Sequence, residues 1–156
     1  MLLLMGLIAA AVSLSLHGPS RSARMDTVLE QVKHFDRVIR EHARRFDEPV
    51  QILFELDTGT IRAVDAVNQR PRGMSFTLPA DFKLEQVRTH QEQTSRGQAA
   101  VPCSSHGLTP SYAIAFGDPD AATHWVLFSG LTGQMQRVDN DQQIQQGAIP
   151  KCGYRS

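Results

Sequence analysis

The sequence of 156 residues predicts an α+β fold in which a long N-terminal helix packs on an antiparallel β-sheet domain. Three observations lead to this prediction. Residues 1–16 are apolar and uncharged, residues 25–46 place apolar side chains at helical spacing, and the segments after residue 49 are short, rich in β-formers and separated by turn residues. We therefore expect an apolar helix over residues 1–20, an amphipathic helix over 21–48 and a β-rich domain over 49–156.

The apolar run at the N-terminus has three interpretations. As a helix, its 16 residues would extend about 24 Å, at roughly 1.5 Å per residue, whereas a membrane-spanning helix needs about 20 residues. A buried core helix fits poorly because the run has no polar face, and a cleaved signal peptide fits poorly because no Lys or Arg precedes it. We favour a retained membrane anchor whose beginning lies upstream of Met1.

An amphipathic helix follows the interruption at Gly18 and Pro19. Its apolar residues recur every three or four positions and form one stripe, widened by Leu29, Val38 and Ala43: Met25, Val28, Val32, Phe35, Ile39 and Phe46. The opposite face is charged, with Glu30, Lys33, Arg37, Arg40, Glu41 and Arg44. Asp47 and Glu48 should end the helix, because the residue before Pro49 resists helical geometry. The stripe needs an apolar partner, and the sheet that follows can provide one.

The remaining segments predict strands over 50–56, 60–67, 74–78, 82–87, 112–116, 125–128 and 134–138. Asp57, Thr58 and Gly59 form the turn of a first hairpin, and residues 129–133 form the turn of a second. The polar stretch 89–103, which contains Gly97 and Pro102, is interpreted as a long loop. The Gln-rich tail over 140–156 is expected to be irregular.

Composition and motifs argue against most kinds of chemistry. The 16 basic and 16 acidic side chains balance, which disfavours a surface dedicated to nucleic acid. Leu56, Asp57, Thr58 and Gly59 match the short motif of aspartic proteases, but no second copy supplies the partner carboxylate, so the turn interpretation is preferred. The six histidines are scattered, and the sequence has no glycine loop for phosphate. We expect no catalytic residue, metal or cofactor, and no small-molecule substrate.

The two cysteines, Cys103 and Cys152, suit an exported protein. In an oxidising compartment they could form one disulfide that ties the C-terminal tail to a loop. The alternative is two unpaired thiols.

In its order of segments the chain resembles type IV pilin-like proteins, and most closely the GspH-type minor pseudopilins of type II secretion and their FimT-like relatives in type IV pili. The resemblance rests on the apolar helix, on an Arg-rich helix end with a Pro-Val step (residues 44–50), on the strand 51–56 with its Asp-Thr-Gly turn, and on the late strand 125–128 with the turn 131–133. The family's basic leader, cleavage-site Gly, following Phe and Glu are missing. Residues 1–8 resemble the part after that Glu, so we expect Met1 to be internal to the gene product.

This resemblance implies a non-enzymatic structural subunit of a pseudopilus that supports protein export. Its partners would be other pseudopilin subunits, and it would be a single-pass protein of the inner membrane with its head in the periplasm. The assembly helix would use apolar side chains that lose nothing on moving from lipid into a helix bundle: Leu2, Leu3, Leu4, Leu7, Ile8, Val12, Leu14 and Leu16.

Two other functions stay open. FimT-like proteins bind DNA in some systems, and a few cations toward the C-terminus could contact phosphates: Arg137, Lys151 and Arg155. The chain could also be an unrelated exported β-domain behind a signal peptide.

Overall fold

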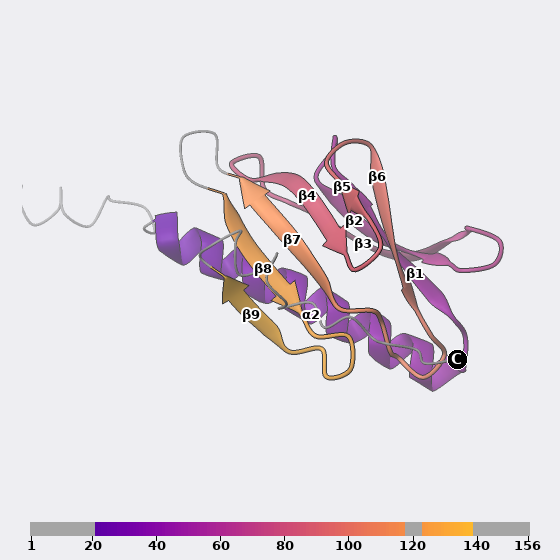
Figure 1. Cartoon of the computed structure of the whole chain (residues 1–156). Coiled ribbons are helices and arrows are strands. Elements are labelled where there is room, and N and C mark those ends of the chain that lie inside the picture. Colours follow the sequence, from indigo (N-terminus) through magenta and orange to yellow (C-terminus); the bar gives the residue numbers. More distant parts are fainter. Residues whose placement is uncertain (1–20, 118–122, 139–156) are drawn as a thin grey trace, which may run out of the picture. The chain divides into compact units, whose positions relative to one another are not determined.

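The computed structural model describes residues 21–117 and 123–138. Within these residues one helix precedes nine strands, in the order drawn in Figure 1. The helix is α2 (Arg21–Phe46) and the strands are β1 (Val50–Glu55), β2 (Thr60–Asp65), β3 (Pro71–Thr77), β4 (Lys83–Thr89), β5 (Gln93–Thr94), β6 (Gln98–Cys103), β7 (Tyr112–Gly117), β8 (His124–Phe128) and β9 (Met135–Val138).

Helix α2 confirms the predicted amphipathic helix. The chain divides into two units within it, Met1–Gln31 and Val32–Ser156. In the second unit Val32, Ile39 and Ala43 are buried, while Phe35 is half-buried and Phe46 is 54% exposed, so the predicted stripe is narrower than expected. In the first unit the side chains of Met25, Val28 and Leu29 are buried.

The predicted stop of the helix is also confirmed. Asp47 adopts a left-handed conformation with φ of 51°, and the Glu48 amide donates a 3.2 Å hydrogen bond to the carbonyl oxygen of Ala43. This pattern closes a helix end by satisfying a free carbonyl, and Pro49 then prevents further helix. Among residues 21–117 and 123–138, no helix is both long and apolar enough to cross a membrane.

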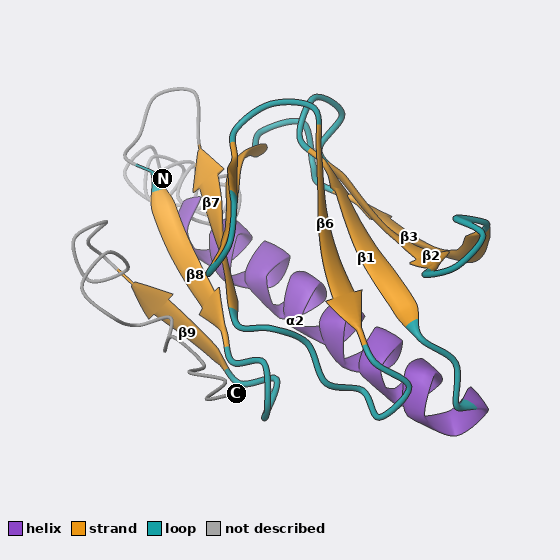
Figure 2. Cartoon of the chain, turned by 45° about the vertical axis from the view of Figure 1, so that its right-hand side comes forward, coloured by secondary structure: helices purple, strands orange, loops and turns teal. Residues whose placement is uncertain are grey.

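The strands form two antiparallel sheets instead of the single sheet that we expected. One has the order β3-β2-β1-β6 and the other the order β5-β4-β7-β8-β9. Both predicted hairpins are present, since β1 pairs with β2 and β8 pairs with β9. Figure 2 shows β6 of the first sheet ending beside the second half of α2, which belongs to the second unit.

The second unit has a core that joins the two sheets. Ile52 and Phe54 of β1, Ile114 of β7 and Phe128 of β8 are each at most 1% exposed. Tyr112 of β7 links them, because its ring stacks on Phe128 at 4.9 Å and lies 5.8 Å from Phe54. Burial of such aromatic side chains is a large part of the stability of a domain of this size.

The prediction of a long loop over 89–103 was wrong. Strands β5 and β6 lie there, and β6 pairs along its whole length with β1, with Val50 opposite Cys103 and Glu55 opposite Gln98. Alternate residues of β6 are buried, namely Ala99, Val101 and Cys103. Strand β6 lies at the edge of its sheet, so it is hydrogen-bonded to a neighbouring strand on one side only. Pro102, which has no backbone N–H to donate, can therefore be accommodated in it.

Candidate functional site

A buried ion pair lies on α2 where the sequence predicted a solvent-facing charge. Asp36 and Arg40 are each 3% exposed, and the Arg40 Nε donates a 2.7 Å hydrogen bond to Asp36 Oδ2. Arg40 was expected on the polar face of the helix, and this prediction was wrong. It lies beside Ile39 at the margin of the apolar stripe, where loops of the sheet domain cover it.

The guanidinium group of Arg40 holds two loops against α2. The first loop, residues 104–111, joins β6 to β7, and the second, residues 129–134, joins β8 to β9. Arg40 donates to Thr109 Oγ1 at 2.8 Å and to the Gly130 carbonyl oxygen at 2.7 Å. The remaining oxygen of Asp36 accepts a 2.7 Å hydrogen bond from the Tyr112 hydroxyl. We refer to Asp36, Arg40, Thr109 and Tyr112 as the clamp.

Two glycines allow the loops to approach this closely. A Cβ at Gly130 would overlap the backbone of the first loop at the Thr109 carbonyl oxygen, and the Thr109 amide donates a 3.3 Å hydrogen bond to the Gly130 carbonyl oxygen. A Cβ at Gly107 would lie 2.7 Å from the Arg40 carbonyl oxygen, and Gly107 has a φ of 72°. The two loops therefore form one closely packed unit with the helix.

The same two loops carry exposed apolar side chains. Leu131 is 79% exposed and Leu108 is 44% exposed. Figure 1 and Figure 2 both show the two loops at the same end of their strands, next to the second half of α2. We refer to Leu108 and Leu131, with the loops that carry them, as the loop surface.

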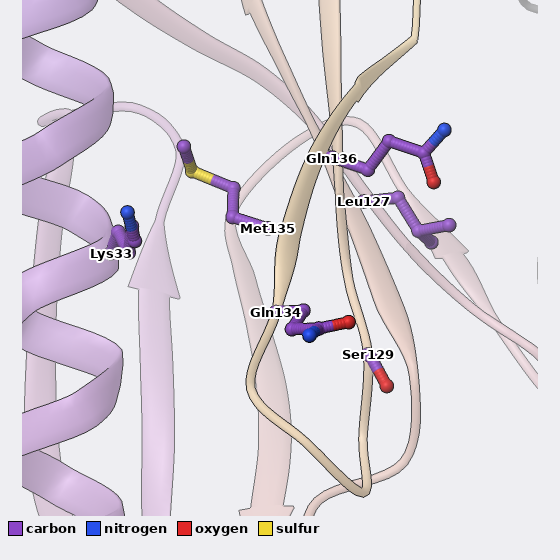
Figure 3. A pocket seen from close by; sticks show the side chains of 6 residues that line it. All are labelled: Lys33, Leu127, Ser129, Gln134, Met135 and Gln136. Carbon is purple, nitrogen blue, oxygen red and sulfur yellow. The ribbon is translucent and has the colours of Figure 1, made fainter.

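A hollow of about 500 Å³ adjoins the second loop and strand β9 (Figure 3). The Met135 side chain points to the side of β9 on which Lys33 of α2 lies, whereas Leu127 and Gln136 lie on the other side. Its lining residues are Lys33, Leu127, Ser129, Gln134, Met135 and Gln136. In the described part of the chain, no three His, Cys, Asp or Glu side chains are grouped so that they could hold a metal.

The predicted site residues fall partly inside the described residues. Cys103 ends β6, is 1% exposed, and has a pKa raised by burial of its thiol. Arg137 is exposed on β9, and Asp57, Thr58 and Gly59 form the predicted β1–β2 turn. The other predicted residues lie outside the described residues: Leu2, Leu3, Leu4, Leu7, Ile8, Val12, Leu14, Leu16, Lys151, Cys152 and Arg155.

No protein-family model and no curated protein matches the sequence. Among solved structures, the minor pseudopilin EpsH from the Type 2 Secretion System of Vibrio cholerae matches with a TM-score of 0.50. The match covers 72% of this chain and 94% of EpsH, at 9% sequence identity. At an identity this low the match shows a similar fold, and no side-chain role of EpsH applies to this chain. The fold of the chain is thus similar to that of a type II secretion minor pseudopilin.

Proposed function

We propose that the chain is a non-enzymatic structural subunit, a minor pseudopilin of a type II secretion pseudopilus, which supports protein export across the envelope. The observation that carries this proposal is the fold, in which a long helix leads into two antiparallel sheets and which is similar to the fold of the minor pseudopilin EpsH. The clamp supports it, because it fixes the second half of the long helix to the sheet domain through Thr109, Gly130 and Tyr112.

The apolar residues 1–16 supply the assembly element in this proposal. Other pseudopilin subunits would pack against this helix in the inner membrane and in the filament, with the head in the periplasm. Exchange of lipid for neighbouring helices is possible because both surroundings are apolar, so packing decides the association.

Deletion of the gene in cells that make the protein tests this function. We expect secreted enzymes to accumulate in the periplasm, and we expect the intact chain to restore their export. The variant Ile8→Arg should fail to restore export, since it places a charge in the assembly helix. Val67→Arg is the matched control, because Val67 is 84% exposed on the β2–β3 connection and tolerates a charge. Normal export in the deletion strain would reject the proposal.

The same strain tests the DNA-uptake alternative, for which Arg137 is the one predicted contact within the described residues. That alternative predicts that the deletion strain exports proteins normally but takes up less DNA. It also predicts salt-sensitive DNA binding by the purified protein in a mobility-shift titration.

A further inference from the structure

We propose that the loop surface docks another protein subunit, one that presents an apolar pocket bordered by carboxylates. The inference names a class of partner for the proposed assembly subunit and so rests on the proposed function. Three features point to such a partner: two exposed leucines, rigid loops that carry them and basic side chains beside them.

The exposure of Leu108 and Leu131 is the first step. Both are branched aliphatic side chains on polar loops, and Leu131 is 79% exposed. The hydrogen bond from the Thr109 amide to the Gly130 carbonyl oxygen joins the residues next to them in sequence, so the two leucines are carried by adjacent backbone segments. Grouped exposed apolar side chains on loops mark interaction sites more often than scattered ones do.

The rigidity of the loops is the second step. Arg40 binds Thr109 of the first loop and Gly130 of the second through one guanidinium group that is itself buried. A surface fixed in this way loses little conformational freedom when a partner binds. The clamp therefore does more than connect helix and sheet, because it holds the leucines ready for a partner.

Charge next to the loops defines the partner. Exposed basic side chains of α2 lie on the flank from which Arg40 reaches the loops: Lys33 lines the hollow with Ser129, and Arg44 would be the neighbour of a Cβ at Gly107. Arg37 lies between them on the same flank. Within residues 32–46 the exposed acid is Glu41, whose carboxylate pairs with Arg37 at 3.6 Å. A basic border of this kind favours an acidic partner.

A protein fits this surface better than nucleic acid or a second copy of the chain does. Leucine offers a base no hydrogen bond, whereas most nucleic-acid surfaces rely on cations for the phosphates and on polar or aromatic side chains for the bases. In the described part of this chain, the hollow beside β9 is bordered by Lys33 and not by carboxylates, so a copy does not complement the loop surface there.

Site-specific photo-crosslinking in cells tests the proposal with the full chain. A photoreactive residue is placed at position 131, at position 108 and, as matched control, at position 67, which is equally apolar and 84% exposed. We expect positions 131 and 108 to give an adduct with the same protein, at a peptide that contains Asp or Glu, and position 67 not to give it.

Charge reversal tests complementarity in the same assay. Arg44→Glu should lower the adduct yield at position 131 by about five-fold or more, and reversal of the mapped carboxylate to Lys should restore it. Arg45→Glu is the control, since Arg45 lies on the exposed side of the helix and its guanidinium stacks on Phe46 at 5.7 Å. Thermal melting of both variants checks that they fold.

Four outcomes would overturn the proposal: no adduct, an adduct shared with position 67, a nuclease-sensitive adduct, or an adduct between two copies of the chain. The export assay is independent of this readout. Intact export in the deletion strain together with a mapped acidic partner would reject the proposed function and support the docking surface. Lost export without an adduct would support the proposed function and reject the docking surface.

Discussion

At the residue scale, the buried pair of Asp36 and Arg40 decides how α2 is held. Both oxygens of the Asp36 carboxylate have donors, from the Tyr112 hydroxyl and the Arg40 Nε, each at 2.7 Å. Removal of one member of such a pair leaves an uncompensated buried charge, which costs about 3–5 kcal/mol. We predict that Arg40→Met lowers the free energy of unfolding by this amount, measured by urea unfolding of the full chain with circular dichroism.

An exposed pair on the same helix provides the control for Arg40→Met. Arg37 and Glu41 are also four residues apart, but their side chains are 68% and 62% exposed and their charged atoms are 3.6 Å apart. Water screens such a pair, so Arg37→Met should cost less than about 1 kcal/mol. Equal losses in the two variants would mean that burial does not matter for the clamp.

Tyr112 predicts how stability responds to alkaline pH. Burial raises the pKa of its hydroxyl well above the ordinary value of 10.0, and the neighbouring Asp36 carboxylate adds to the shift. The folded state holds this proton more tightly than the unfolded chain does. The protonated hydroxyl therefore contributes its full share of the free energy of unfolding below about pH 10, and this contribution declines as the pH rises above it. When the pH is raised from about 8 to about 11, the free energy of unfolding should therefore fall less in Tyr112→Phe than in the parent protein. Parallel declines of the urea midpoint in both proteins would contradict this assignment.

At the element scale, the sequence pattern predicted the elements that show their periodicity locally. Helix α2 and both hairpins could be found because apolar spacing and turn residues lie within one segment. Strand β6 could not be found in this way, because Ala and Pro have a low propensity for strands. Its partner β1 also lies far away in sequence, with Val50 opposite Cys103. Alternation of Ala99, Val101 and Cys103 was the one available signal.

The clamp could not be predicted from the sequence for a related reason. Arg40 follows Asp36 by four residues, a spacing that on a helix usually indicates a solvent-exposed ion pair. Its burial depends on two loops that contact it at Thr109 and Gly130. The sequence around residue 40 contains no pattern that predicts these contacts. Sequence patterns give the face of a helix, but not the loops that cover its margin.

The contact between the two loops predicts unequal effects of two glycine substitutions. Gly130→Ala should destabilise the protein by about 2–3 kcal/mol, because its methyl group would overlap the backbone at Thr109. Gly73→Ala is the control: Gly73 has a φ of 72° but nothing within 4 Å of an added Cβ. It should cost about 1–2 kcal/mol through backbone strain alone.

Amide hydrogen exchange separates these two causes. The Thr109 amide donates a hydrogen bond to the Gly130 carbonyl oxygen. Its hydrogen should therefore exchange faster in Gly130→Ala, whereas its exchange rate should not change in Gly73→Ala. Unchanged exchange at Thr109 in both variants would show that the loops do not depend on each other.

At the scale of the whole molecule, the similarity to EpsH concerns the fold, and the specific features belong to this chain. At 9% identity the match shows a similar fold over 72% of the chain. The clamp and the loop surface are derived from this chain's own contacts. Export, docking and stability therefore need separate measurements, since each depends on a different part of the molecule.

The disulfide between Cys103 and Cys152 is a prediction that concerns the whole chain, because it would connect strand β6 to the C-terminal segment. Cys103 is 1% exposed at the end of β6, and Cys152 lies outside the described residues. Closing a loop of this length would stabilise the fold by a few kcal/mol, about 4 in the chain-entropy estimate. In an oxidising compartment we expect the unreduced, denatured protein to contain no thiol that can be labelled, and two after reduction.

The single variants make the thiol assay specific. Cys152→Ser should leave one thiol, at Cys103, that reacts only after denaturation, because burial shields the sulfur and raises its pKa. Cys103→Ser should leave a thiol at Cys152. Labelling of both cysteines in the unreduced, denatured parent protein would rule out the bridge. A protein that is half labelled would instead point to partial oxidation, which an oxidant added before denaturation should complete if the two cysteines are within reach of each other.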